Sequence, residues 1–233
     1  MDKNLKKVSV LMSTFNSAGT VAKSIESITN QTYKNLELLI VDDNSSDDTF
    51  NIIKRYSELN ENIFVFKNEL NIGLTKSLNF LILKSKGELI ARQDDDDISY
   101  PGRIKKQVDE LERDGLDFCT TRALTNPTKK KIPGISYYLP VEQLLKFKNP
   151  FIHGTLLIEK EIIQSQSGYD ENFYYAQDLK LMIDLIDNGF KYKIINEVLY
   201  ELNTKNNISE KKSKEQRYYA TCARKRINPT LIK

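Results

Sequence analysis

The chain has 233 residues, of which 39% are hydrophobic, so it can bury a sizeable core as one large domain or two small ones. Its 35 basic and 32 acidic residues give a net charge of +3, which does not suggest nucleic-acid binding. No stretch approaches the ~20 apolar residues of a membrane span, and the N-terminus carries no signal-peptide pattern, so we expect a cytoplasmic protein.

Short apolar runs alternate with amphipathic segments through the first 120 residues. Strands are expected where the apolar runs fall, at residues 8–12, 36–41, 63–66 and 89–91. Helices are expected to follow them, beginning at Ser17, at Asp47 and Asp48, at Gly73 and at Pro101. This β-α-β-α order predicts an α/β fold in which helices cover both faces of a mostly parallel, Rossmann-like sheet.

Polar residues follow three of these strands at the point where each ends. The segments are 13–16, 42–45 and 94–97. Open α/β sheets bind ligands at the carboxyl ends of their strands, so the three loops predict one site. The pattern loosens after Thr121, and we expect the second half to pack on the same sheet and form a second wall of that site.

The four consecutive aspartates from Asp94 to Asp97 are the strongest local signal. Carboxylates this close repel each other, and a cation would relieve the repulsion. With no Cys or His nearby, they suit a hard ion such as Mg²⁺ or Mn²⁺. The alternative is an exposed acidic turn before the helix at Pro101. Arg103 follows the run, and we expect it to pair with a local carboxylate.

Phosphate-binding glycine loops are absent, because neither G-x-G-x-x-G nor G-x-x-x-x-G-K-[ST] occurs. Several other motifs occur in a fixed order: VSVLMSTFN at 8–16, SITNQTY at 27–33, LLIVDDNSSDDT at 38–49, NIGL at 71–74, KGELIARQDDDD at 86–97, PFIHGT at 150–155 and YAQDL at 175–179. Together, over roughly residues 6 to 200, they resemble family 2 glycosyltransferases.

The resemblance implies a GT-A fold, a nucleoside diphosphate sugar as donor and inversion at the anomeric carbon. By position, it implies that the nucleotide is bound by Ser13, Phe15, Asp43, Asn71, Gly73, Asp94 and Asp95. Phe15 would stack on the base, and Asp43 would accept a hydrogen bond from a uracil ring N–H. For Asn71 and Gly73, a plain turn at the start of a helix is the alternative.

The same resemblance assigns the remaining site residues. Asp96 would be the first ligand of Mn²⁺ or Mg²⁺, with Asp94 as its partner. Asp97 and His153 would face the acceptor or the donor phosphate. Asp178 would be the base that accepts the proton of the acceptor hydroxyl. For His153 the alternative is a structural role, and for Asp178 it is a residue in the first turn of a helix.

Three positions depart from the family pattern. Gln177 stands where the family usually has Glu, and Asp95 fills a slot that usually holds a small residue. The Arg and His that often follow the last core strand are absent from the stretch Glu201 to Thr204, although Lys205 could replace one contact.

We therefore expect a GT-A glycosyltransferase domain over residues 1–205 and a basic helical extension over residues 206–233. The enzyme would transfer a hexosyl or N-acetylhexosaminyl group from a UDP-sugar to a glycan or lipid-linked glycan, in the biosynthesis of bacterial capsule, O-antigen or lipooligosaccharide. The basic stretch from Lys211 to Arg226 is either a solvated helix or a contact with the inner face of the membrane. Two other functions stay open: a non-catalytic nucleotide-sugar-binding partner in a glycan assembly complex, and a sugar nucleotidyltransferase.

Overall fold

The computed structural model of the chain describes residues 5–205 and 213–230. Strands and helices alternate through the first half, as the sequence predicts, and each predicted strand extends one or two residues further. The elements are β1 (Val8–Thr14), α1 (Val21–Thr29), β2 (Leu36–Asp42), α2 (Thr49–Leu59), β3 (Ile63–Lys67), α3 (Leu74–Lys84) and β4 (Leu89–Arg92).

The second half contains shorter elements around two long strands. They are β5 (Ile98–Ser99), α4 (Arg103–Asp114), β6 (Phe118–Asn126), β7 (Lys131–Ile132), η1 (Ile135–Tyr138), α5 (Val141–Leu144), η2 (His153–Thr155), β8 (Leu157–Glu159), α6 (Lys160–Ser165), α7 (Gln177–Asp187), β9 (Tyr192–Asn203) and α9 (Ser213–Lys225).

The described strands form one mixed sheet in the order β3-β2-β1-β4-β8-β6-β9-β5, with β7 paired to β6. Strands β1 to β4 are parallel to one another. The short strand β8 runs antiparallel to both β4 and β6, and so joins the second half of the chain to the first. The expected α/β fold is confirmed, and the second half does pack on the same sheet.

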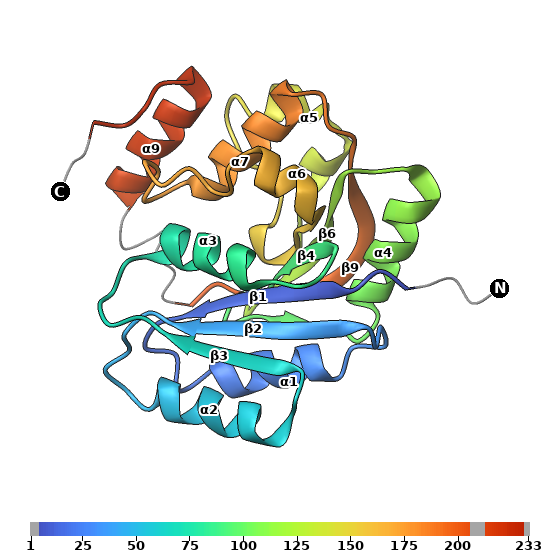
Figure 1. Ribbon diagram of the computed structural model, residues 1–233. Coiled ribbons are helices and arrows are strands. Elements are labelled where there is room, and N and C mark those ends of the chain that lie inside the picture. The colour runs from blue at the N-terminus through green and yellow to red at the C-terminus, as the bar shows by residue number, and fades with distance from the viewer. Residues whose placement is uncertain (1–4, 206–212, 231–233) are drawn as a thin grey trace.

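Both faces of the sheet are covered, because successive side chains of a strand point to opposite sides. In β1, Val8, Val10 and Met12 contact the helices α1, α2 and α4, whereas Leu11 belongs to the cluster formed with α3, α6 and α7. Figure 1 shows α1 and α2 on one side of β1 to β3 and α3 on the other.

Helix α9 packs on α7 and belongs to the same hydrophobic cluster. The Tyr219 ring lies 6.2 Å from that of Phe173 and 5.7 Å from that of Tyr175. The boundary at residue 205 stays a prediction, since residues 206–212, which include Lys211 and Lys212, lie outside the described residues. Within the described part of the chain, no helix is long and apolar enough to cross a membrane.

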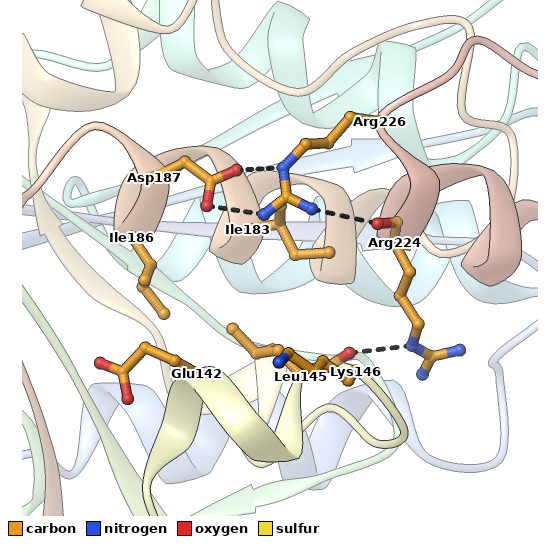
Figure 2. Close-up of a pocket in the computed structure, with 8 residues that line it drawn as sticks. All are labelled: Glu142, Leu145, Lys146, Ile183, Ile186, Asp187, Arg224 and Arg226. Atoms are coloured by element: carbon orange, nitrogen blue, oxygen red, sulfur yellow. Dashed lines mark hydrogen bonds and ion pairs between the residues drawn. The ribbon is translucent and has the colours of Figure 1, made fainter.

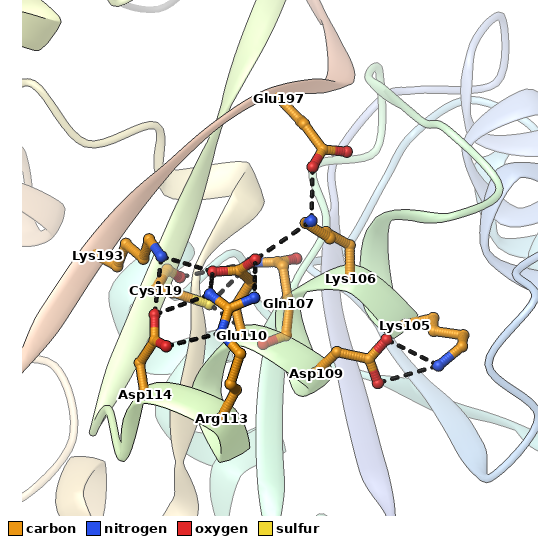
Figure 3. A network of polar contacts seen from close by, with 10 residues as sticks. All are labelled: Lys105, Lys106, Gln107, Asp109, Glu110, Arg113, Asp114, Cys119, Lys193 and Glu197. Atoms are coloured by element: carbon orange, nitrogen blue, oxygen red, sulfur yellow. Dashed lines mark hydrogen bonds and ion pairs between the residues drawn. The ribbon is translucent and has the colours of Figure 1, made fainter.

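A network of ion pairs joins α4 to β9 (Figure 3). Glu110 accepts hydrogen bonds from Arg113 at 2.5 Å and Lys193 at 2.6 Å, and Lys106 lies 3.2 Å away. Lys193 belongs to β9, so the network ties the helix to that strand. The surrounding cations, Arg113 first, lower the pKa of Glu110 to about 2.

We expect Glu110→Gln to lower the free energy of unfolding at pH 7 by about 1–3 kcal/mol, because charge-assisted hydrogen bonds are lost. Since the folded-state pKa is depressed, this stabilisation is present above the usual value of 4.5 and is lost as the pH falls toward 2. Denaturant titration at pH 7 and pH 3 should therefore give a smaller difference from wild type at pH 3.

The matched control is Asp109→Asn on the same helix, where Asp109 pairs with Lys105 in an exposed i,i+4 pair. It should cost less than about 0.5 kcal/mol. Equal losses in the two variants would contradict the role given to the Glu110 network.

Candidate functional site

Three loops meet at the carboxyl ends of β1, β2 and β4, as the sequence predicts. The N–H of Asn16 donates to Ser45 Oγ at 2.9 Å, and Asn16 Oδ1 accepts from the Ser46 N–H at 2.8 Å. Asp95 accepts hydrogen bonds from the Phe15 N–H and from the Ser17 hydroxyl. These contacts hold Ser13 and Phe15, at the end of β1, next to the loops that follow β2 and β4. The Phe15 side chain remains 50% exposed.

The buried carboxylate of Asp43 anchors the segment of residues 68–73. Its Oδ1 accepts hydrogen bonds from Asn68 Nδ2 at 2.8 Å and the Ile72 N–H at 2.9 Å, and its Oδ2 accepts from the Gly73 N–H at 2.8 Å. A carboxylate has about four acceptor sites, so these three bonds use most of them. The exposed Asn71 lies on the same segment.

Gly73 is required where this segment meets α3. Its φ of 85° lies in the left-handed region, and a Cβ would come within 2.8 Å of the Tyr174 ring. Only glycine combines that backbone conformation with this close approach. The predicted residues Asp43, Asn71 and Gly73 are therefore brought together by one loop.

The four aspartates have different partners, so the run is not a uniform cluster. The buried Arg92, 1% exposed, pairs with Asp94 Oδ1 at 2.5 Å. Asp96 Oδ2 accepts a hydrogen bond from Asn203 Nδ2 at 3.2 Å, and Asp97 Oδ1 accepts from the Asn203 N–H at 2.6 Å. In residues 5–205 and 213–230, no lysine or arginine forms an ion pair with the last three aspartates.

Burial raises the pKa values of the three unpaired carboxyls. Asp95 rises to about 7 and Asp96 to about 6, and Asp97 lies well above its usual value. Repulsion by neighbouring aspartates adds to the effect in each case. Ionisation of these three carboxyls is therefore costly in the site.

The described residues do not assemble three acidic, histidine or cysteine side chains around one point. Asp96 is nevertheless only partly buried, and its hydrogen bond from Asn203 leaves acceptor sites open. Within the described residues, the buried Asp97 Oδ2 has no hydrogen-bond partner. This donor set fits a hard cation that takes one protein carboxylate and completes its coordination with diphosphate oxygens and water. Asp94 as a second ligand stays a prediction.

Arg103 differs from the expectation that it pairs with a carboxylate, which is wrong for the described residues. Its fully buried guanidinium donates to the carbonyls of Arg92 at 3.0 Å and Gly154 at 3.2 Å. It also lies over the Tyr200 ring at 5.5 Å. Burial lowers its pKa to about 10, so it remains charged and joins α4, β4 and η2. Sequence spacing cannot distinguish carbonyl from carboxylate partners.

Gly154 allows the tightest approach in the site. A Cβ at this position would clash with the Tyr200 hydroxyl and come within 2.7 Å of Asp94 Oδ2. The Tyr200 hydroxyl in turn accepts a hydrogen bond from the Asp94 N–H at 3.2 Å. Tyr200 and Gly154 thus position Asp94, although the sequence did not mark Tyr200 as a site residue.

His153 hydrogen-bonds through Nε2 to the Tyr169 hydroxyl at 2.8 Å. Burial, with a contribution from Arg92, lowers its pKa to about 4, so the imidazole is neutral at pH 7. The charges of Asp94 and Asp178 both act in the opposite direction on this pKa. His153 is therefore within electrostatic range of both the acid run and Asp178.

Asp178 lies in the first turn of α7, as predicted. Its Oδ2 accepts a hydrogen bond from Asn149 Nδ2 at 2.8 Å. Asn149 Oδ1 accepts from the Phe151 N–H at 3.1 Å, which fixes the orientation of the amide. Among the residues that the structure describes, none hydrogen-bonds to the second carboxylate oxygen of Asp178. The sequence did not identify Asn149 as a site residue, because it lies 29 positions from Asp178 and no local motif connects the two.

Comparison with known proteins gives a consistent assignment. The family described as glycosyl transferase family 2 matches residues 9–171. A putative glycosyltransferase of Bacillus subtilis, EpsE, is 32% identical over 89% of this chain and 76% of its own length. The O-antigen biosynthesis glycosyltransferase WbnJ of Escherichia coli is 32% identical over 89% of this chain and 83% of its own length.

Solved structures support the predicted GT-A fold. Staphylococcus aureus TarS, crystallised with UDP, has a TM-score of 0.75 at 18% identity and is matched over 93% of this chain and 65% of its own. The Pyrobaculum calidifontis mannosyltransferase PcManGT, with GDP-Man and Mn²⁺, has a TM-score of 0.76 at 18% identity, over 94% of this chain and 63% of its own. The chain thus spans less than two thirds of each. At this identity the likeness shows the fold alone, and it confirms that prediction.

We expect Gly154→Ala to lower the free energy of unfolding by about 1–3 kcal/mol, because the added methyl forces Tyr200 and Asp94 to move. Denaturant titration measures the loss. Gly19→Ala is the control, since nothing lies within 4 Å of a Cβ at Gly19. A Gly154→Ala protein as stable as this control would show that Asp94 is not held against Gly154.

Proposed function

We propose a donor, a cofactor and an acceptor for this chain, which belongs to glycosyl transferase family 2 and is a glycosyltransferase. It transfers a sugar from a UDP-sugar to a glycan or lipid-linked glycan, with inversion, in bacterial surface-polysaccharide biosynthesis. The observation that carries the proposal is the meeting of Phe15, Asp43 and the acid run at one edge of the sheet, with Asp178 on the second wall.

The nucleotide part of the proposal rests on Phe15 and Asp43. The half-exposed Phe15 ring offers an apolar face on which a base can stack. Asp43 keeps one acceptor site beside Gly73, which suits a ring N–H such as that of uracil. The presence of UDP in the TarS structure supports uridine, whereas PcManGT was solved with GDP-Man.

The diphosphate part rests on Asp96. Partly exposed, and with one hydrogen bond from Asn203, Asp96 would hold Mn²⁺ or Mg²⁺, with Asp94 next to it. When bound, the cation would neutralise the charge that grows on the leaving diphosphate. PcManGT was solved with Mn²⁺. The stretch Glu201 to Thr204 lacks the Arg and His that the family often has there, and Lys205 could replace one of their contacts.

The acceptor part rests on Asp178. One oxygen of Asp178 is held by Asn149, so the other can accept the proton of an acceptor hydroxyl. The deprotonated oxygen attacks the anomeric carbon while the diphosphate leaves from the opposite side, and a single displacement of this kind inverts the configuration. His153, neutral at pH 7, can donate or accept a hydrogen bond on the same side of the site.

A non-catalytic nucleotide-sugar-binding partner is the second candidate, favoured by Gln177 and by the missing Arg and His. Such a protein would bind the donor without transferring sugar. The sugar nucleotidyltransferase alternative is less well supported, because the loop after β1 lacks the glycines and basic residues that hold a nucleoside triphosphate.

We expect UDP to bind in a manner that depends on Mn²⁺ or Mg²⁺, and Asp96→Asn to weaken the metal-dependent binding by more than about tenfold. Isothermal titration calorimetry with and without metal measures this. The control is Asp48→Asn at the start of α2, where the exposed carboxylate makes no capping hydrogen bond and accepts one from Asn51. UDP binding that is equal with and without metal would overturn the role of Asp96.

We expect Asp178→Asn to retain UDP binding and to lower sugar transfer roughly 100- to 10,000-fold, because the base is lost. A screen of UDP-sugars for metal-dependent hydrolysis identifies the donor for this assay. Asp184→Asn on the same helix, whose carboxylate pairs with Lys180, is the control and should transfer normally. Transfer at the wild-type rate by Asp178→Asn would require another base, and no transfer by wild type would favour the binding partner.

A further inference from the structure

Large apolar side chains are exposed along one short stretch of the chain. Ile135 is 87% exposed, Tyr138 72%, Leu139 53% and Phe147 83%. Ile135 and Tyr138 belong to η1, Leu139 lies between η1 and α5, and Phe147 lies in the turn after α5; we call residues 135–148 the 135–148 segment. Large exposed apolar side chains that lie so close together in the sequence are candidates for a contact surface.

Two lysines flank the most prominent of these side chains. Lys146 and Lys148 are exposed on either side of Phe147 in the turn after α5. Within the described residues neither lysine forms an ion pair with a carboxylate. The turn therefore combines one exposed aromatic ring with two free positive charges, which is the composition of a site that meets an anionic lipid surface.

Two basic residues near the C-terminus, Arg224 and Arg226, are engaged by the protein itself (Figure 2). Arg224 donates to the carbonyls of Leu145 at 2.9 Å and Phe147 at 3.0 Å. Arg226 forms two hydrogen bonds with Asp187, at 2.6 and 2.8 Å. Arg224 thus holds the backbone of the turn against α9, which leaves Phe147 directed into solvent.

The turn also leads directly to the second wall of the site. Asn149, the residue after Lys148, donates the hydrogen bond that fixes Asp178. A surface that holds Phe147 in the headgroup region would therefore bring Asp178 close to molecules anchored in the same bilayer.

We propose that the 135–148 segment is a contact with an anionic lipid bilayer, and that it presents a lipid-linked acceptor to Asp178. The second half of this statement rests on the proposed function. The apolar side chains enter the boundary between headgroups and acyl chains, and Lys146 and Lys148 meet lipid phosphates. The contact is peripheral.

The first experiment is co-sedimentation of the full chain with vesicles of phosphatidylglycerol and phosphatidylcholine. We expect Phe147→Ala to lower partitioning roughly tenfold, from the apolar area that no longer enters the bilayer. Replacing Lys146 and Lys148 by alanine should lower it about 25-fold, roughly fivefold for each charge. Wild type should bind pure phosphatidylcholine vesicles much more weakly, because the anionic phosphates are missing.

Matched controls lie on α2, on the other side of the sheet in Figure 1. Leu59, 86% exposed, is replaced by alanine as the counterpart of Phe147, and Lys54 and Arg55 are replaced by alanine as the counterpart of the lysine pair. These controls should partition as wild type. The proposed surface is wrong if wild type does not bind anionic vesicles. It is also wrong if partitioning of the α2 controls decreases as much as that of the segment variants.

The second experiment separates this inference from the proposed function. Each variant is tested for metal-dependent UDP binding, and for transfer to the acceptor either embedded in vesicles or freed from its lipid. The segment variants should bind UDP normally, lose transfer to the embedded acceptor and keep transfer to the free one. Equal loss with both acceptors overturns the presentation of the acceptor. Failure of wild type to bind UDP overturns the proposed function, whereas the vesicle result still decides the membrane contact.

Discussion

The crowding of carboxylates at the end of β4 is the constraint on which the rest of the site depends. Four aspartates lie in sequence at a largely buried strand end, and among residues 5–205 and 213–230 a cation, Arg92, pairs only with Asp94. Burial and mutual repulsion raise the pKa values of Asp95, Asp96 and Asp97. The folded chain therefore carries an unfavourable electrostatic term that hydrogen bonds reduce only in part. A bound divalent cation would remove much of this repulsion. The free energy released in that way would contribute to the affinity for the cation.

The second half of the chain keeps this arrangement in place. At the end of β9, Asn203 contacts both Asp96 and Asp97, which lie 107 and 106 residues earlier. Farther back on the same strand, the Tyr200 hydroxyl supports the backbone of Asp94. The ion pairs around Glu110 hold β9 against α4, and α4 begins at Arg103, which reaches back to β4. Site and scaffold are thus one continuous set of contacts rather than a loop added to a finished fold.

Local pattern was enough to predict the part of the fold that lies early in the chain. Its buried parallel strands are apolar runs that end in polar residues, so both the strands and the meeting of their loops could be predicted. The second half of the sheet, which has both parallel and antiparallel strands, could not be predicted. Its connecting strand β8 has only three residues and pairs with two strands that lie far apart in the sequence. The contacts of Arg103, Asn149 and Tyr200 were not predicted for a related reason. Each side chain contacts a residue far away in the sequence, and which residues meet depends on the strand order, which the spacing of the sequence does not reveal.

The hydrogen bonds of Asp43 have a consequence for the way in which a donor would bind. Asp43 accepts three hydrogen bonds from the chain itself, from Asn68, Ile72 and Gly73, so the fold holds residues 68–73. The conformational entropy of that loop is therefore lost during folding, and binding does not have to order it again. A donor that binds as proposed would meet a surface already shaped on this side of the site, so its rate of encounter would depend on diffusion and on the local electrostatic field rather than on slow closure of the loop.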